Sequence, residues 1–194
     1  MSVGPGTLTP TSSPESVVVK FTSLLHGIGS SGDSVNSDSS LSNKSPLRVS
    51  REVVVEVFNN DEEIVGTKTG TITYNSATGR FDGTVDLGTS VVPGNYLVKV
   101  KTPQFLRESF SGITSLGRGT NNLPTVTFIS GDVNGDNVLN ILDYNFILGC
   151  YSDLTPAKAC DAVQKLNTDL DDDGKVNQRD YNLFLREVAG RSGS

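Results

Sequence analysis

The chain has few of the residue types on which many enzymes and membrane proteins depend. Its 194 residues include one histidine, His26, one methionine, Met1, two cysteines and no tryptophan. A Ser-His-Asp or Cys-His catalytic arrangement would have to use His26, and no G-x-S-x-G nucleophile motif is present. No apolar run approaches the roughly 18–20 residues that cross a bilayer. We therefore expect neither an enzyme nor a membrane span in this chain.

Other binding functions are also disfavoured by composition. The net charge of −6 argues against nucleic acid, and a single methionine argues against a Met-rich sensor groove. Residues 27–32 fit G-x-G-x-x-G, but the Ser-rich residues that follow cannot open the helix that a nucleotide site needs. A carbohydrate-binding sandwich would usually offer a platform of aromatic side chains. The chain has no tryptophan, and Tyr74 and Tyr96 are its only tyrosines before residue 131, so carbohydrate binding is a minor alternative.

Two segments near the C-terminus repeat one twelve-residue pattern, 132–143 and 169–180. Each has short oxygen-bearing side chains at positions 1, 3, 5, 9 and 12, and six to eight oxygens are what Ca²⁺ prefers. Position 7 offers a backbone carbonyl, and position 6 holds Asn137 or Gly174, residues that tolerate a left-handed backbone. The predicted calcium ligands are Asp132, Asn134, Asp136, Val138, Asn140 and Asp143 in loop 1, and Asp169, Asp171, Asp173, Lys175, Asn177 and Asp180 in loop 2.

The distribution of charge supports two calcium sites. Residues 131–194 hold 11 acidic against 6 basic residues, whereas residues 1–130 hold 11 against 10. Carboxylates packed into one loop without a cation would have raised pKa values and would resist closure of the loop. We therefore expect two Ca²⁺, one in each loop, and tighter binding in loop 2, which has four candidate ligand carboxylates against three in loop 1.

The duplication also resembles a known family. Each loop leads into a similar helix start, Asp143-Tyr144-Asn145-Phe146 and Asp180-Tyr181-Asn182-Leu183, position 12 is Asp, and the repeat opens on Gly131-Asp132-Val133-Asn134-Gly135-Asp136. These features resemble the type I dockerin family over roughly residues 131–189. The resemblance implies a small all-α, EF-hand-like module with three helices and two calcium ions, which docks onto a cohesin-like partner protein.

The dockerin resemblance also implies partner-binding residues. In that family, recognition commonly uses loop positions 10 and 11 and a basic residue later on the helix. These positions hold Gln178, Arg179 and Arg186 in repeat 2, and apolar Ile141 and Leu142 in repeat 1. The two faces therefore differ, and Ile141 and Leu142 could be buried against the sandwich or against an apolar surface of a partner. If repeat 2 is the partner-facing surface, we expect the chain's own sandwich to cover them at least partly.

Cys150 and Cys160 both lie between the two loops. Their proximity in sequence favours a disulfide, which would indicate an oxidising, extracellular setting. Two free thiols or a zinc site are the alternatives, although zinc would need four ligands and His26 is remote in sequence.

The first 130 residues predict an all-β domain. Alternation of apolar and polar residues in 17–21, 52–57 and 96–101, with shorter strand-like pieces at 70–74, 80–87, 106–110 and 125–129, favours an antiparallel β-sandwich. The turn at 92–96 resembles immunoglobulin-like and carboxypeptidase-regulatory-like domains. We therefore expect a multidomain chain: linker 1–14, immunoglobulin-like sandwich 15–130 with a mobile Ser-rich insertion at 27–46, dockerin-like module 131–190 and tail 191–194.

Within the dockerin-like module, a short helix is expected over 153–166, with Thr155 as its N-cap, and a last helix from Gln178 to a stop at Gly190. Two functions compete for the chain as a whole. The calcium module either docks onto a cohesin-like partner in a secreted or surface complex, or packs on its own β-sandwich as a structural end-piece.

Overall fold

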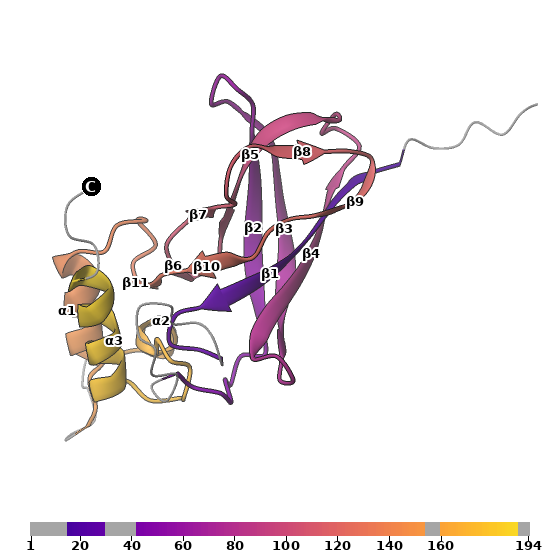
Figure 1. The fold of residues 1–194 in the computed structure, drawn as a ribbon. Helices are drawn as coiled ribbons and strands as arrows, with labels where there is room; N and C mark the ends of the chain where they lie inside the picture. Colours follow the sequence, from indigo (N-terminus) through magenta and orange to yellow (C-terminus); the bar gives the residue numbers. More distant parts are fainter. Residues whose placement is uncertain (1–14, 30–41, 154–159, 190–194) are drawn as a thin grey trace, which may run out of the picture.

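The computed structural model describes residues 15–29, 42–153 and 160–189. A β-rich body occupies most of the chain, and helices follow at its C-terminal end (Figure 1). The strands are β1 Val17–Leu25, β2 Ser50–Phe58, β3 Ile64–Asn75, β4 Arg80–Gly88, β5 Gly94–Lys101, β6 Gln104–Phe105, β7 Glu108–Ser109, β8 Thr114–Leu116, β9 Gly119–Asn122, β10 Val126–Phe128 and β11 Ser130–Asp132. The helices are α1 Ile141–Cys150, α2 Ala162–Thr168 and α3 Gln178–Ala189.

The long strands form because their apolar residues recur at every second position. In β1, Val17, Val19 and Phe21 are buried while the residues between them are more exposed, and β2, β4 and β5 alternate in the same way. Since successive side chains of a strand point to opposite faces, this pattern gives each strand one apolar face. These faces enclose a single hydrophobic cluster. The expected all-β domain is confirmed.

Nine strands form one curled sheet in the order β10-β1-β4-β3-β2-β5-β7, with β8 paired to β5 and β9 to β1, and β6 and β11 form a separate two-stranded sheet. The end strands β7 and β10 contact each other, so the sheet closes round its core (Figure 1). Pairing is antiparallel except along one edge of β1, where β9 and then β10 run parallel to it. The expected antiparallel sandwich is confirmed, with the one difference that two short late strands run parallel to β1 at this edge.

The helical module has a hydrophobic core of its own, which includes Ile147, Leu170, Val176 and Phe184. The predicted disulfide between Cys150 and Cys160 is present, so the alternatives of free thiols and zinc are excluded. It ties the end of α1 to the segment that precedes α2.

Two of the predicted helix boundaries can be compared with the structure. Helix α2 begins later than expected because Asp161 caps it, accepting hydrogen bonds from the amides of Val163 and Gln164. The proposed N-cap, Thr155, lies outside the described residues, as does Gly190. The predicted start of the last helix at Gln178 agrees with α3.

The Ser-rich segment is structured at both of its described ends. Ile28 is buried, Gly29 donates its amide to the carbonyl of Asn43, and Asn43 returns a bond to Gly27. Residues 42–47 then run against loop 2, where Leu47 donates its amide to the carbonyl of Asp172. These ends therefore pair with each other and with loop 2, and the mobility expected over 27–46 stays a prediction. Residues 30–41 lie outside the described residues.

Candidate metal centre

Both calcium-loop segments fold in the same way. Loop 1 connects β11, which ends at Asp132, to α1, and loop 2 connects α2 to α3. In each loop the Asp at position 12 is buried and binds the loop's own backbone. Asp143 accepts from the amides of Val133, Asn134 and Asn140 at 2.9, 3.2 and 3.0 Å.

The corresponding carboxylate of loop 2 makes the same contacts. Asp180 accepts from the amides of Leu170, Asp171 and Asn177 at 2.6, 3.3 and 2.8 Å. In both loops the donors are therefore positions 2, 3 and 9. The matching bonds show that the sequence repeat is also a structural repeat.

The backbone turns through the left-handed region at the same two positions of each loop. Position 6 has φ 67° at Asn137 and 89° at Gly174, as its residue types predicted. Position 4 is also left-handed, with φ 80° at Gly135 and 59° at Asp172. The second turn was not anticipated, although Gly and Asp are among the residues that adopt it most readily.

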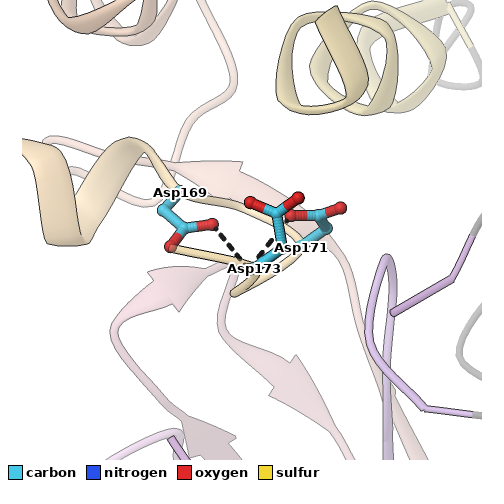
Figure 2. A group of neighbouring side chains, drawn as sticks. All are labelled: Asp169, Asp171 and Asp173. Atoms are coloured by element: carbon cyan, nitrogen blue, oxygen red, sulfur yellow. Dashed lines mark hydrogen bonds between the residues drawn. The ribbon is translucent and has the colours of Figure 1, made fainter. Parts of the chain in front are cut away.

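In loop 2 the first three ligand positions converge. Figure 2 shows Asp169, Asp171 and Asp173 grouped on one side of the loop, and their carboxylate oxygens lie within 4.8 Å of one another. The amide of Asp173 donates to Asp169 Oδ1 at 3.0 Å and to Asp171 Oδ1 at 3.3 Å, which holds the group together. Three carboxylates in this space form a strongly negative, partly buried centre.

The electrostatics of the acids reflect this crowding. Burial, followed by the charges of Asp173 and Asp169, raises the pKa of Asp171 to about 7. Burial also raises the pKa of Asp180 to about 7, with the charge of Asp171 adding to the effect. Burial likewise raises the pKa of Asp169 and of Asp143. The side-chain amide of Asn134 lowers the pKa of Asp136 at the exposed rim of loop 1. These acids favour a cation that would stabilise their charged forms.

The residues present fit calcium at both loops. Asp132 and Asp171 are 1% and 2% exposed, and Asp132 Oδ1 and Asp171 Oδ2 have no hydrogen-bond partner among the described residues. A buried acceptor that no donor satisfies is costly, and a bound cation removes this cost. Hard oxygen donors in this number and spacing suit Ca²⁺.

The ligand positions 7 and 9 are placed as expected in the chain but have different surroundings. Val138 and Lys175 have exposed side chains and offer only their carbonyls. The side-chain oxygens of Asn140 and Asn177 accept the amides of Leu142 and Arg179, each at 2.7 Å, at the helix starts. A ligand role for these two residues, possible through a bridging water, stays a prediction.

The β-sandwich reaches both loops. In loop 2, Asp172 is held by Arg48 and Arg51, while the side-chain amide of Gln104 donates to the carbonyls of Leu166 and Asp169. In loop 1, β11 pairs with β6, and Lys101 lies 2.7 Å from Asp132. Sequence analysis did not identify any of these sandwich residues, because their role depends on contacts between distant parts of the chain.

His26 lies between the end of β1 and α3. It is buried, and its Nδ1 lies 2.9 Å from Glu187 Oε2 of α3. The only histidine therefore belongs to the contact between the end of β1 and the last helix.

The predicted partner-binding residues occupy two stripes of the helices. Arg179 and Arg186, seven residues apart on α3, share one stripe with side chains 66% and 20% exposed. Ile141 and Leu142 are 64% and 53% exposed. The expectation that the sandwich covers this apolar pair is therefore wrong, because the sandwich contacts the loops and leaves the start of α1 free.

A second stripe is apolar and spans both helices. Tyr144 of α1 and Tyr181 of α3 have ring centroids 5.9 Å apart. At helical spacing from these two rings lie exposed or half-exposed side chains: Ile141, Leu148 and Tyr151 in repeat 1, and Gln178, Leu185 and Val188 in repeat 2. Leu148, Tyr151, Gln178 and Tyr181 line a shallow hollow of about 140 Å³. We call these eight residues the two-helix face.

Among the described residues, no helix is long and apolar enough to cross a membrane.

Comparison with known proteins agrees with this geometry. The dockerin type I domain family matches residues 130–189. A chain in the crystal structure of an N-terminal interface mutant of a type II cohesin–X–dockerin complex from Acetivibrio cellulolyticus is similar over 88% of this chain and 94% of that chain, with 20% identity and a TM-score of 0.51. A C-terminal interface mutant of the type II complex from the same organism is similar over 87% and 94%, with 18% identity and a TM-score of 0.46.

No curated protein matches the chain. At 20% identity the first structural likeness establishes shared architecture. The chain thus combines a curled β-sandwich with a C-terminal module, residues 130–189, that matches the dockerin type I domain.

Proposed function

We propose that the chain binds two calcium ions, one in each loop, and that the loaded module docks onto a cohesin-like domain of a partner protein. The single observation that carries the proposal is the duplicated loop geometry, in which both position-12 carboxylates bind the amides of positions 2, 3 and 9. The match of residues 130–189 to the dockerin type I domain supports it.

The calcium ligands in this proposal are the predicted side chains at positions 1, 3, 5 and 12 and the carbonyl at position 7. When bound, each ion supplies a central positive charge for the converging oxygens. The chain itself holds each loop in shape, because backbone amides of the loop donate hydrogen bonds to the carboxylates of Asp143 and Asp180. Loading then stabilises the module, because the ion binds the folded loops and not the unfolded chain.

The docking surface in this proposal is the two-helix face. Large apolar side chains gathered on one exposed surface mark a protein-binding site, and Ile141, Leu148 and Val188 are 64%, 46% and 40% exposed. Arg179, on the neighbouring stripe, adds a positive rim. A cohesin domain is the partner that the dockerin match favours, and the structurally similar chains come from cohesin–dockerin complexes.

The structural alternative has its own observation. The sandwich contacts loop 2 through Arg48, Arg51 and Gln104, which is how a calcium-stabilised end-piece would be attached. These contacts involve the loops, however, and Ile141, Leu148 and Val188 of the two-helix face are exposed in the described part of the chain. We therefore favour docking, with the sandwich as the rigid support of the docking module. The disulfide and the dockerin match favour a non-catalytic role outside the cell.

Capture of recombinant cohesin domains by the immobilised chain tests this proposal, with calcium or with EGTA. We expect calcium-dependent binding that Ile141→Asp abolishes. The matched control is Val163→Asp, since Val163 is 67% exposed and also lies in the first turn of a helix, α2, outside the two-helix face. Equal binding by both variants, or binding that persists in EGTA, would contradict the proposal.

A further inference from the structure

A side chain of the sandwich contacts the first ligand position of loop 1. Lys101 is the last residue of β5, and its Nζ donates to Asp132 Oδ2 at 2.7 Å and to the carbonyl of Gly135 at 3.2 Å. Asp132 is 1% exposed, and the Lys101 side chain is 26% exposed. This ammonium is therefore partly shielded from solvent and fixed beside the loop.

The two oxygens of Asp132 have different surroundings. Oδ2 accepts the amide of Asn137 at 3.1 Å as well as the Lys101 ammonium. Oδ1 is buried and has no hydrogen-bond partner among the described residues. Lys101 therefore binds Oδ2 and leaves Oδ1 for a metal ion, so the ammonium and a metal ion can be present together.

Loop 2 has no equivalent of Lys101 in the described part of the chain. Asp169 Oδ2 accepts the amide of Gly174 at 2.8 Å, as Asp132 Oδ2 accepts that of Asn137, but no lysine or arginine pairs with this carboxylate there. Arg179 lies 4.0 Å from Asp171 and is 66% exposed, so solvent screens its charge. Arg48 and Arg51 lie beside loop 2 but bind the Asp172 carboxylate, which is not a ligand position, and Arg48 Nη2 donates to the backbone carbonyl of Asp169 at 3.4 Å.

The charge that each ion meets therefore differs between the loops. Loop 1 has three ligand carboxylates and the ammonium of Lys101, which pairs with one of them, whereas loop 2 has four ligand carboxylates and two arginines that pair with the non-ligand Asp172. A fixed positive charge a few ångströms from a divalent cation repels it, and the repulsion is larger where solvent is partly excluded.

We propose that Lys101 is a built-in counter-ion of the loop 1 calcium site. It orients Asp132 against the sandwich through the contact with Oδ2, and it lowers the affinity of loop 1 for calcium. Loop 1 is therefore the weaker, exchangeable site, and its occupancy is coupled to its contact with the sandwich. This inference rests on the proposed calcium binding.

The test is a calcium titration of the full chain followed by NMR, in which each loop has its own reporter. The amides of Asn137 and Gly174 bind the position-1 carboxylates of loops 1 and 2. We expect Lys101→Met to lower the dissociation constant of loop 1 about tenfold and to leave loop 2 within about twofold. Lys101→Gln keeps a donor for Asp132 without the charge and should act in the same direction, whereas Lys101→Arg should bind like the wild type.

Lys99→Met is the matched control. Lys99 lies two residues earlier on β5, so it shares a face of the strand with Lys101, but its Nζ lies 4.7 Å from the centre of the Phe58 ring. Lys99→Met removes the same charge from the protein as Lys101→Met. We expect the calcium dissociation constants of both loops to stay within about twofold of the wild-type values.

The outcomes separate this inference from the proposed function. If both wild-type loops titrate but neutral variants at Lys101 leave loop 1 unchanged or weaken it, the counter-ion role is overturned. An equal gain from Lys99→Met would also overturn it, since the effect would then be one of overall charge. If neither reporter responds in the wild type, the proposed calcium binding itself fails.

Discussion

Arg48 holds Asp172 through two hydrogen bonds: its backbone amide donates to Asp172 Oδ2 at 2.7 Å, and its Nε donates to Oδ1 at 2.6 Å. Asp172 is 1% exposed and also lies 3.2 Å from Arg51 Nη2. Position 4 of loop 2 is thus turned away from the ligand cluster and fixed to the sandwich. The left-handed backbone of Asp172 makes this orientation possible.

Removing the charge of Asp172 should destabilise the protein strongly. Asp172→Asn keeps the size of the side chain and the tolerance for a left-handed backbone but leaves Arg51 buried without its partner. We expect a loss of about 3 kcal/mol in the free energy of unfolding, measured by urea denaturation in EGTA. The control, Asp61→Asn on an exposed turn, should change stability by less than about 0.5 kcal/mol. Equal effects of the two changes would show that the ion pairs of Asp172 with Arg48 and Arg51 contribute little to stability.

Replacing each of two glycines by alanine should change the stability of the chain in opposite directions. Gly174 has φ 89°, and an added Cβ would lie 2.9 Å from Leu47 Cδ1, so Gly174→Ala should weaken calcium binding by loop 2 and destabilise the chain by about 1–2 kcal/mol. Gly149 lies within α1 with open space around it, and Gly149→Ala should stabilise by about 0.5–1 kcal/mol. Thermal melts of both variants in calcium test the pair. A stabilising Gly174→Ala would contradict the turn geometry.

Removing the disulfide should lower the stability of the helical module. The bond joins residues 10 apart, and in the chain-entropy model a ring of this size stabilises by about 3 kcal/mol. Protein made under oxidising conditions should show no alkylatable thiol by mass spectrometry. Cys150→Ser with Cys160→Ser should lower the melting temperature by several degrees. Two free thiols in the oxidised protein would remove the main support for an extracellular setting.

Calcium binding should release protons near neutral pH. Burial raises the pKa of Asp171 and Asp180 to about 7, so metal-free loop 2 holds protons that calcium must displace. Calorimetry at about pH 6.5 in buffers of different ionisation enthalpy should therefore show proton release, and the release should fall towards zero at about pH 8.5. Buffer-independent heats at the lower pH would contradict the raised pKa values.

The same shift sets the sign of the stability change with pH in EGTA. Because the folded pKa lies above the unfolded value of about 3.9, the folded chain binds more protons between about pH 4 and 7. The contribution of Asp171 and Asp180 to the free energy of unfolding of the metal-free chain should therefore fall as the pH rises through this window. Calcium should offset the loss above about pH 7, where both carboxylates are charged.

The loops themselves were predictable from sequence because the ligands of each loop lie within twelve consecutive residues. Asp143 and Asp180 could be assigned by spacing alone, and their amide partners are also local. Local signals also predicted α3 and the long alternating strands. The short strands β8, β9 and β11 have three or four residues each, with a weak pattern, and were missed.

The contact between sandwich and loops could not be predicted in this way. Arg48 and Asp172 are 124 residues apart, and Lys101 is 31 residues from Asp132, so nothing in either local pattern indicates the pairing. The same contact explains why Ile141 and Leu142 are exposed. The sandwich contacts the loops and, through His26, one side of α3, and Ile141 and Leu142 stay exposed at the start of α1.

The two position-12 acids should differ in their effect on calcium affinity. Asp180→Ala leaves only loop 1 intact and Asp143→Ala leaves only loop 2, and loop 2 has more ligand carboxylates and no counterpart of Lys101 in the described residues. Asp180→Ala should therefore retain the weaker of the two sites. Calorimetry of both variants measures this directly. The reverse order would show that loop shape outweighs charge.

Isothermal calorimetry of calcium binding to the metal-free wild-type chain tests the central claim most directly. The duplicated loops, each with a buried carboxylate oxygen that no donor of the described residues reaches, predict two sites and a large rise in melting temperature on loading. A fit to one site, or no binding heat and no change in melting, would contradict the account.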